Sequence, residues 1–199
     1  MSVFIQKYSA WTDAENMPKL AFVPMLFRRR LSDLSKMVAY VVHDISEDFA
    51  PVPMTFASEF GEIARQFKIS SGILDSGEVS PAMFSLSVFN APVAAASIIE
   101  KNMTGYSAVF SGKRSFEDGL REASAPLLSG RETERIFVFA DERIPSAYSA
   151  ISPYPNPVCA LAMRLSTEPA DALCELELSP LPEADTAAEQ ALYFLEHYL

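Results

Sequence analysis

Hydrophobic and polar positions alternate along this chain with two different periods, which predicts helices and strands in turn. In Leu31–Asp44 apolar residues recur every three or four positions, which is typical of a helix with one buried face. The same reasoning predicts a helix in Ser58–Lys68 and a third in Asn90–Lys101. Ser115 and Thr186, each followed three positions later by an acidic residue, mark the starts of two more helices.

Short runs rich in β-branched and aromatic residues lie between these helices and predict strands. The runs are Val3–Ser9, Met54–Ala57, Tyr106–Phe110, Arg135–Ala140, Val158–Leu165 and Leu173–Leu178. We expect the last two to form a hairpin around Thr167–Asp171, and Ser70–Ser80 to be a loop broken by its glycines. Strands that alternate with helices predict a layered α/β fold, a mixed sheet with helices on its faces. We expect residues 1–199 to form a single domain.

The composition restricts the classes of function. The 199 residues are 49% hydrophobic and carry a net charge of −10, which favours a folded protein and argues against nucleic-acid binding. The N-terminus lacks the pattern of a secretory signal, and no run approaches the roughly 18 apolar residues that span a bilayer. Cys159 and Cys174 lie in strand-like segments and are expected to be reduced and buried. We therefore expect a cytoplasmic protein without an integral membrane segment.

One basic cluster, Arg28–Arg30, interrupts this acidic composition. Three consecutive guanidinium groups can hold an anionic partner. Such a run more often flanks a helix, where it is solvated or ion-paired. The sequence leaves both interpretations open.

The stretch Ser80–Leu120 carries the candidate chemistry. It contains a predicted helix, a short strand and a second helix, with Asn90 and the pair Ser97–Ile98 ahead of the strand. This order resembles the core of the β-ketoacyl synthases, thiolase-fold enzymes that extend acyl chains on acyl carrier protein. In those enzymes a nucleophilic cysteine follows the strand at the N-terminus of the next helix, a place that falls at or beside Arg114 here. This region of the sequence contains no cysteine.

Three further stretches extend the resemblance from about Phe22 to about Leu165, namely Phe22–Met37, Thr55–Ile63 and Phe139–Pro145. Together they resemble the short ketosynthase-like chain length factors of bacterial aryl polyene gene clusters. The resemblance implies a thiolase-like layered fold of which this chain is a single half, the half that carries the nucleophile in a complete ketosynthase. Only seven glycines are present, about half the average usage of roughly 7%, which indicates that an active site has not been maintained.

The resemblance implies a non-catalytic chain length factor. Such a factor heterodimerises with an active β-ketoacyl-ACP synthase and helps to shape its acyl tunnel in polyene- or polyketide-type chain elongation. Condensation needs a thiolate and histidines, and Arg114 can supply neither function. His43 and His197 are the only histidines and are expected to be surface or structural residues. The partner would supply catalysis and, because this chain is acidic, the docking site for the acidic carrier protein. We expect no cofactor and no metal.

Individual residues receive candidate roles from the same resemblance. Met83, Phe84 and Phe89 would shape the partner's tunnel, although a methionine and aromatic stripe is more often core packing. The strand residues Ser107, Ala108, Val109 and Phe110 would pair across the dimer interface. Arg114 would either plug the vacated nucleophile position or be a surface residue at the start of a helix.

Other functions have weaker support in the sequence. A non-catalytic homodimeric scaffold, or a binder of a small apolar ligand, would need no ketosynthase. A hydrolase is disfavoured because there is no G-x-S-x-G motif and no suitably placed histidine. A ketosynthase with its own nucleophile would need Cys159 or Cys174, which both lie in later predicted strands. An exposed strand and an apolar dimer face also predict poor solubility of the chain alone.

Overall fold

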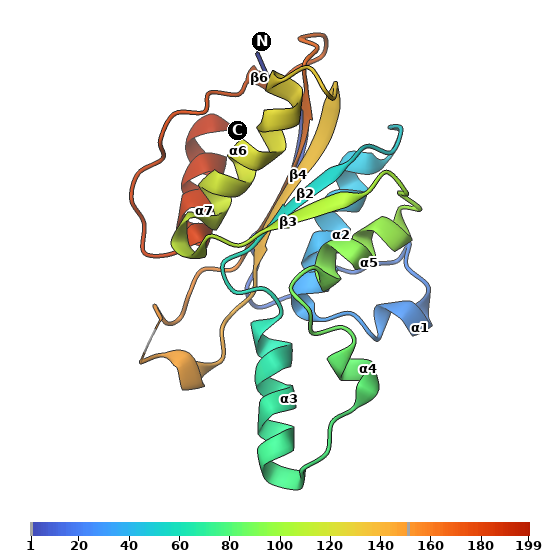
Figure 1. Ribbon diagram of the computed structural model, residues 1–199, viewed down its shortest axis with the longest axis vertical. Helices are drawn as coiled ribbons and strands as arrows, with labels where there is room; N and C mark the ends of the chain where they lie inside the picture. The colour runs from blue at the N-terminus through green and yellow to red at the C-terminus, as the bar shows by residue number, and fades with distance from the viewer. Residues whose placement is uncertain (1, 151) are drawn as a thin grey trace.

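The computed structural model describes residues 2–150 and 152–199, and its centre is a six-stranded mixed sheet (Figure 1). The strands follow the order β3-β2-β4-β5-β1-β6. Their bounds are Phe4–Trp11 (β1), Met54–Ala57 (β2), Tyr106–Val109 (β3), Glu134–Asp141 (β4), Cys159–Ser166 (β5) and Cys174–Glu175 (β6). β2 is parallel to β3 and β4, whereas β5 is antiparallel to β4 and β1. The sheet therefore has a parallel part that ends at β3 and an antiparallel part that ends at β6.

Helices cover both faces of this sheet, as the sequence pattern predicts (Figure 1). The covering helices are α2 (Asp33–Ser46), α5 (Ala91–Ile99), α6 (Ser115–Leu128) and α7 (Ala187–Tyr198). Apolar side chains of α2 and α5 pack on one face together with Phe56 of β2, and those of α6 and α7 pack on the other together with Phe137 of β4. Each face thus has its own hydrophobic core, and the expected layered fold with a mixed sheet is confirmed.

The remaining helices are short or project from the sheet. They are α1 (Met25–Arg28), α3 (Ile63–Ser76), α4 (Pro81–Phe84) and the 3₁₀ helices Gly112–Arg114 and Ser146–Tyr148. α3 and α4 extend beyond one end of the sheet, at the bottom of Figure 1, and α3 has no buried residue. Within residues 2–150 and 152–199 no helix is long and apolar enough to cross a membrane.

The predicted hairpin between the last two strands is wrong. β1 lies between β5 and β6, because Ile5 pairs with Leu165 on one side and with Cys174 on the other. The connection after β5 therefore passes over β1 before the chain rejoins the sheet. Local sequence could not reveal this arrangement, since the strand that separates the pair comes from the other end of the chain.

The helix predicted at Ser58–Lys68 begins and ends later than expected, because α3 starts at Ile63. The segment Ser58–Glu62 is instead an irregular bend between β2 and α3. Gly72, which was expected to break the chain, lies inside α3, so the predicted loop Ser70–Ser80 is wrong over its first half. Gly77 ends the helix in the left-handed conformation with a φ of 71°, as a C-terminal glycine commonly does.

Two predicted helix caps have opposite outcomes. The capping box of α7 is confirmed, because the Glu189 N–H donates to Thr186 Oγ1 (3.2 Å) and the Thr186 N–H donates to the Glu189 carboxylate (3.4 Å). The cap predicted at Ser115 is wrong, since Arg114 occupies the N-cap and Ser115 is the first residue of α6. The Ser115 hydroxyl accepts a hydrogen bond from the Ser111 N–H (3.0 Å) instead.

Gly119 allows α6 to lie unusually close to the sheet. A Cβ added at Gly119 would lie 2.5 Å from the Ala57 Cβ and 2.9 Å from a ring carbon of Phe137. Gly119→Ala is therefore expected to lower the free energy of unfolding by about 1–3 kcal/mol, because the helix must move away from its core. Denaturant unfolding measures this change. Gly72→Ala is the matched control, since its nearest atom would be 3.9 Å away, and an equal loss in both variants would contradict the prediction.

Candidate functional site

β3 lies at the end of the sheet, and its outer edge has no strand partner among the described residues. Its inner edge pairs in parallel with β2, with Met54 opposite Tyr106 and Ala57 opposite Val109. Tyr106 and Ala108 are exposed, and the side chain of Phe110, directly after the strand, is 66% exposed. An unpaired edge presents backbone N–H and C=O groups that another strand can bond.

Large apolar side chains are exposed in the segments that surround β3. They belong to α4, α5 and the loops beside them, and include Met83, Phe84, Val88, Ile98 and Met103. Two contacts tie these segments to the strand: the Asn90 side-chain amide donates to the Tyr106 hydroxyl (3.1 Å), and the Phe89 and Phe110 rings meet edge to face. Large exposed apolar patches on soluble proteins commonly mark interaction sites, so this side of the molecule is a candidate interface.

The structure separates the three predicted tunnel residues into two groups. Met83 and Phe84 lie in the single-turn helix α4, and their side chains are 36% and 63% exposed. Phe89 is half-buried against Phe56, and its ring lies so close to Gly61 that a Cβ there would be 2.8 Å away. Met83 and Phe84 are therefore available to a partner, whereas Phe89 mainly packs within this chain.

Arg114 is the N-cap residue of α6 and the last residue of the 3₁₀ helix Gly112–Arg114 that follows β3. Its side chain is exposed and pairs with Asp118 one turn along α6 (2.9 Å). A shallow depression beside it is lined by Lys113, Glu183, Asp185 and other polar residues. The N-terminus of a helix stabilises an anion, but the residue at this N-cap is an arginine, whose guanidinium has no nucleophilic atom.

Comparison with known proteins identifies the fold that carries this arrangement. The family model described as "Beta-ketoacyl synthase, N-terminal domain" matches residues 5–197. The chain belongs to this family. No curated protein sequence matches it.

Solved structures of ketosynthase assemblies share the fold. A chain from the complex of the ketosynthase ApeO with its chain length factor ApeC, from Xenorhabdus doucetiae, superposes with a TM-score of 0.80 at 22% identity, over 100% of this chain and 91% of that chain. The ishigamide ketosynthase/chain length factor superposes with a TM-score of 0.65 at 12% identity, over 85% of this chain and 63% of that chain. A β-ketoacyl synthase from Burkholderia phymatum STM815 superposes with a TM-score of 0.64 at 13% identity, over 83% of this chain and 59% of that chain. These likenesses establish a thiolase-like, ketosynthase-type fold.

The cysteines of this ketosynthase-family chain are poor candidates for catalysis. Cys159 is fully buried in β5, and burial raises the pKa of its thiol to about 12, so it stays protonated at neutral pH. Burial also raises the pKa of Cys174, whose Sγ lies 3.6 Å from the Tyr198 carbonyl oxygen. Both residues belong to the antiparallel part of the sheet, away from β3 in the strand order.

Both histidines have structural contacts. His43 Nδ1 lies 3.0 Å from the Glu100 carboxylate, and its ring stacks on Phe22. His197 Nδ1 lies 2.9 Å from the Tyr193 carbonyl oxygen, and its ring stacks on the Tyr193 ring. Among residues 2–150 and 152–199 there is no group of three or more histidine, cysteine, aspartate or glutamate side chains that could hold a metal ion.

Buried carboxylates fix the Ser58–Glu62 bend, a feature that the sequence did not predict. Asp141, at the end of β4, accepts hydrogen bonds from the Ser58 hydroxyl (2.6 Å) and from the backbone N–H groups of Glu59 (3.0 Å) and Phe60 (3.1 Å). The Glu59 carboxylate accepts from the first N–H of α7 (2.7 Å), and the Glu62 carboxylate accepts from two serine hydroxyls at the start of α2. The only signal for this network is an acidic pair directly after a buried strand.

Burial changes the protonation of Asp141 and of the next residue, Glu142, whose carboxylate accepts a hydrogen bond from the Ala64 N–H (3.2 Å). Burial is the main cause that raises the pKa of Asp141 from 3.8 to about 7, although hydrogen bonds from Ser58 and Phe60 oppose it. Burial, and next the nearby Glu62 carboxylate, raise the pKa of Glu142 from 4.5 to about 7. Both groups therefore keep their protons in the folded chain at pH values where the unfolded chain has lost them.

We expect this difference to make the chain less stable as the pH rises. The stabilisation is complete below the unfolded pKa values, declines as the pH rises towards about 7 and is lost above it, a fall on the order of a few kcal/mol. Urea unfolding between pH 5 and 8 measures the slope. Asp141→Asn, which cannot ionise, is expected to flatten it, whereas Asp75→Asn on the exposed end of α3 should not. An unchanged slope in Asp141→Asn would contradict the assignment.

Proposed function

We propose that this chain is a non-catalytic chain length factor, which forms a heterodimer with an active β-ketoacyl-ACP synthase and supplies part of the wall of its acyl tunnel. The observation that carries the proposal is the edge of β3, unpaired within the described chain and flanked by the exposed rings of Phe84 and Phe110. Such an edge can continue into a partner's sheet through backbone hydrogen bonds, while the flanking apolar groups leave water in the same contact.

The chemistry of the chain supports a non-catalytic role. Arg114 stands at the helix N-terminus where ketosynthases need a nucleophile, and a guanidinium has neither a nucleophilic atom nor an accessible neutral form. Cys159 is a buried thiol, and both His43 and His197 are engaged in structural contacts. The partner is therefore the source of the cysteine and the histidines that condensation requires.

The comparisons support the assembly. One similar chain comes from a complex of a ketosynthase with its chain length factor, and another from a ketosynthase/chain length factor. The first match covers all of this chain and 91% of the other, so the two chains have nearly the same length. The other two matches cover only 63% and 59% of longer chains.

Met83 and Phe84 are the residues that would set product length. A bulky side chain at the end of an apolar tunnel excludes further carbons by steric contact. Their exposure leaves them free to enter a partner's tunnel. The products would be of the polyene or polyketide type, made in the cytoplasm without a cofactor on this chain, and the acyl carrier protein would dock on the ketosynthase.

Co-expression with an active ketosynthase from the same organism tests this proposal. Size-exclusion chromatography with light scattering is expected to show a complex of one copy of each chain, while the chain alone should be poorly soluble. A soluble homodimer that does not bind the ketosynthase would overturn the proposed heterodimer. It would favour the alternative function of a homodimeric scaffold or a binder of a small apolar ligand.

A further inference from the structure

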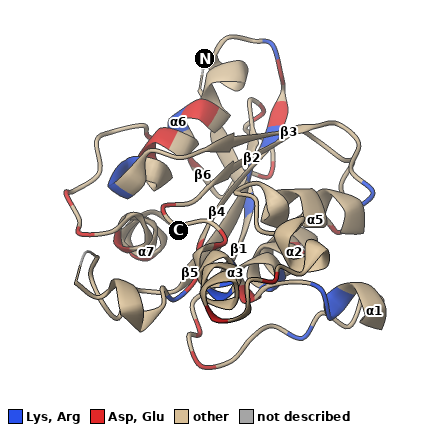
Figure 2. Cartoon of the chain, turned by 60° about the horizontal axis from the view of Figure 1, so that its bottom comes forward, with Lys and Arg blue, Asp and Glu red and all other residues tan. Residues whose placement is uncertain are grey.

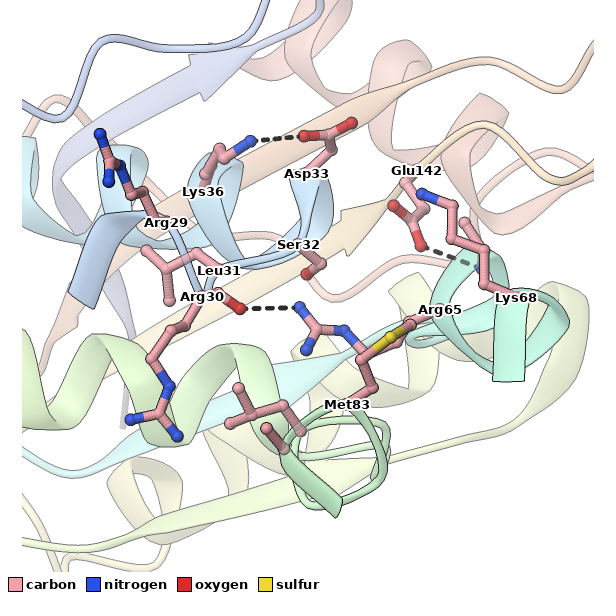
Figure 3. Close-up of a pocket in the computed structure, with 13 residues that line it drawn as sticks. Arg29, Arg30, Leu31, Ser32, Asp33, Lys36, Arg65, Lys68, Met83 and Glu142 are labelled. Atoms are coloured by element: carbon pink, nitrogen blue, oxygen red, sulfur yellow. Dashed lines mark hydrogen bonds and ion pairs between the residues drawn. The ribbon is translucent and has the colours of Figure 1, made fainter. Parts of the chain in front are cut away.

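Two adjoining cavities lie between α1, α2, α3, α4 and α5, next to the candidate interface, since Met83 lines one of them and Val88 and Ile98 line the other. One has a volume of about 440 Å³ and is shown in Figure 3; the other has a volume of about 310 Å³. Arg30, Leu31, Arg65 and Leu86 line both cavities, so the two form one crevice with a junction at these four side chains. Volumes of this size are typical of small-molecule sites.

The smaller cavity is mainly apolar. Its walls are Phe27, Leu31, Leu86, Val88 and Ile98, and its floor is made of Ala91, Ala94 and Ala95 on α5. Three alanines on one side of a helix leave room that larger side chains would fill. Such a space suits a flexible hydrocarbon chain, which gains from leaving water without any directional contact.

The larger cavity is cationic in an otherwise acidic protein. Five basic side chains line it, Arg29, Arg30, Lys36, Arg65 and Lys68, against the two carboxyl groups of Asp33 and Glu142. Figure 2 shows basic residues at α1 within a chain whose net charge is −10. Positive charge gathered in a hollow of a negative molecule attracts an anion to that place.

The contacts of these side chains leave several of them free to bind a ligand. Lys36 pairs with Asp33 (2.8 Å), and Arg65 contacts Glu62 (3.1 Å) and the Arg30 carbonyl oxygen (3.0 Å; Figure 3). The Arg30 guanidinium has no ion pair or hydrogen bond with any residue of the described chain, and the same holds for Lys68. Arg30 and Arg65 both stand at the junction of the two cavities. An anion placed there would meet two guanidinium groups, the side chains best suited to phosphate and carboxylate oxygens.

We propose that this crevice binds an anionic amphiphile, a molecule with an acyl or alkyl tail and a phosphate or carboxylate head. The tail lies along α5 in the smaller cavity, and the head lies between Arg30 and Arg65. Arg29 and Lys68 add positive potential from the larger cavity. All the residues that line the site belong to this one chain, and three of them, Met83, Val88 and Ile98, are also part of the candidate interface.

Isothermal titration with octyl phosphate, below its micelle concentration and at low salt, tests the proposal. The protein is the full chain, alone or in its ketosynthase complex if that is the soluble form. Octyl phosphate is expected to bind more tightly than inorganic phosphate or octanol. Arg30→Gln should weaken its binding by about ten-fold or more. Ala94→Phe should fill the space for the tail, so that octyl phosphate binds no more tightly than inorganic phosphate. Arg131→Gln, an exposed arginine just after α6, is the control and should bind as the unchanged chain does.

Octyl phosphate and octanoate in parallel titrations distinguish a phosphate head from a carboxylate head. Lys68→Gln, at an exposed position on α3, provides a second test of the head site if Arg30→Gln fails to fold. Equal affinity for octyl phosphate and inorganic phosphate would overturn the tail site. Unchanged affinity for octyl phosphate in both Arg30→Gln and Lys68→Gln would overturn the head site. Loss of binding when the chain forms its complex with the ketosynthase would overturn a role for the crevice in the assembled protein.

Discussion

Ala108→Lys in β3 is expected to abolish co-purification of this chain with a ketosynthase. Ala108 is exposed on the strand whose outer edge is unpaired within the described chain, so a lysine there should leave the isolated fold intact. In the assembled dimer the same ammonium group would be buried without a partner, at a cost of about 2–5 kcal/mol of association free energy. Pull-down of the tagged ketosynthase, followed by size-exclusion chromatography, measures the loss.

The opposite edge of the sheet offers a matched control for this experiment. Ala172 lies just before β6, at the other end of the strand order, and Ala172→Lys adds the same charge to the chain. It should leave co-purification unchanged. Equal loss with both substitutions would point to a general effect of charge, and normal assembly of Ala108→Lys would place the interface elsewhere.

Phe84→Ala is expected to lengthen the acyl products of the assembled enzyme. Phe84 is 63% exposed on α4, so its truncation opens no cavity in this chain, and in the proposed role it would remove bulk from the partner's tunnel. Discrimination in an apolar pocket is about 1–3 kcal/mol for each added methylene, so the ratio of longer to normal products should rise by about ten-fold or more. Mass spectrometry of the products released from the carrier protein measures the ratio.

Two other substitutions separate tunnel effects from structural ones. Phe89→Ala removes packing against Phe56 and Phe110 and is expected to destabilise the fold by up to about 3–5 kcal/mol, with a smaller effect on product length than Phe84→Ala. Arg114→Ala removes an exposed ion pair with Asp118, so condensation and product length should both stay nearly unchanged. Product lengths unchanged in both phenylalanine variants would reduce this chain to a stabilising subunit.

The sequence predicted those features that depend on neighbours in the chain. The amphipathic period of α2, the buried run of β4 and the capping box of α7 all follow from residues within a few positions of each other. The hairpin failed because β1 inserts between β5 and β6, a pairing between the two ends of the chain. The predicted start of the helix at Ser58 was wrong for a similar reason. Asp141, from a distant strand, holds Ser58–Glu62 in a bend, so α3 begins later.

The same limit applies to the candidate sites. The sequence could place Arg114 after a strand, but only the strand order shows that β3 lies at the edge. It identified the basic run Arg28–Arg30, but not the cavity that Arg65 and Lys68 of α3 complete. Phe84 and Phe89 have the same chemistry in the sequence, and only their contacts separate an exposed side chain from a packed one.

The lack of buried residues in α3 has a consequence for the amount of protein in the cell. A helix without a core opens at little cost in free energy, and open segments are the first to be cut by proteases. A chain that has not found its partner would then be degraded faster than one in which the partner covers α3. Degradation of unassembled copies would match the number of chains to the supply of partner, without any separate control of synthesis.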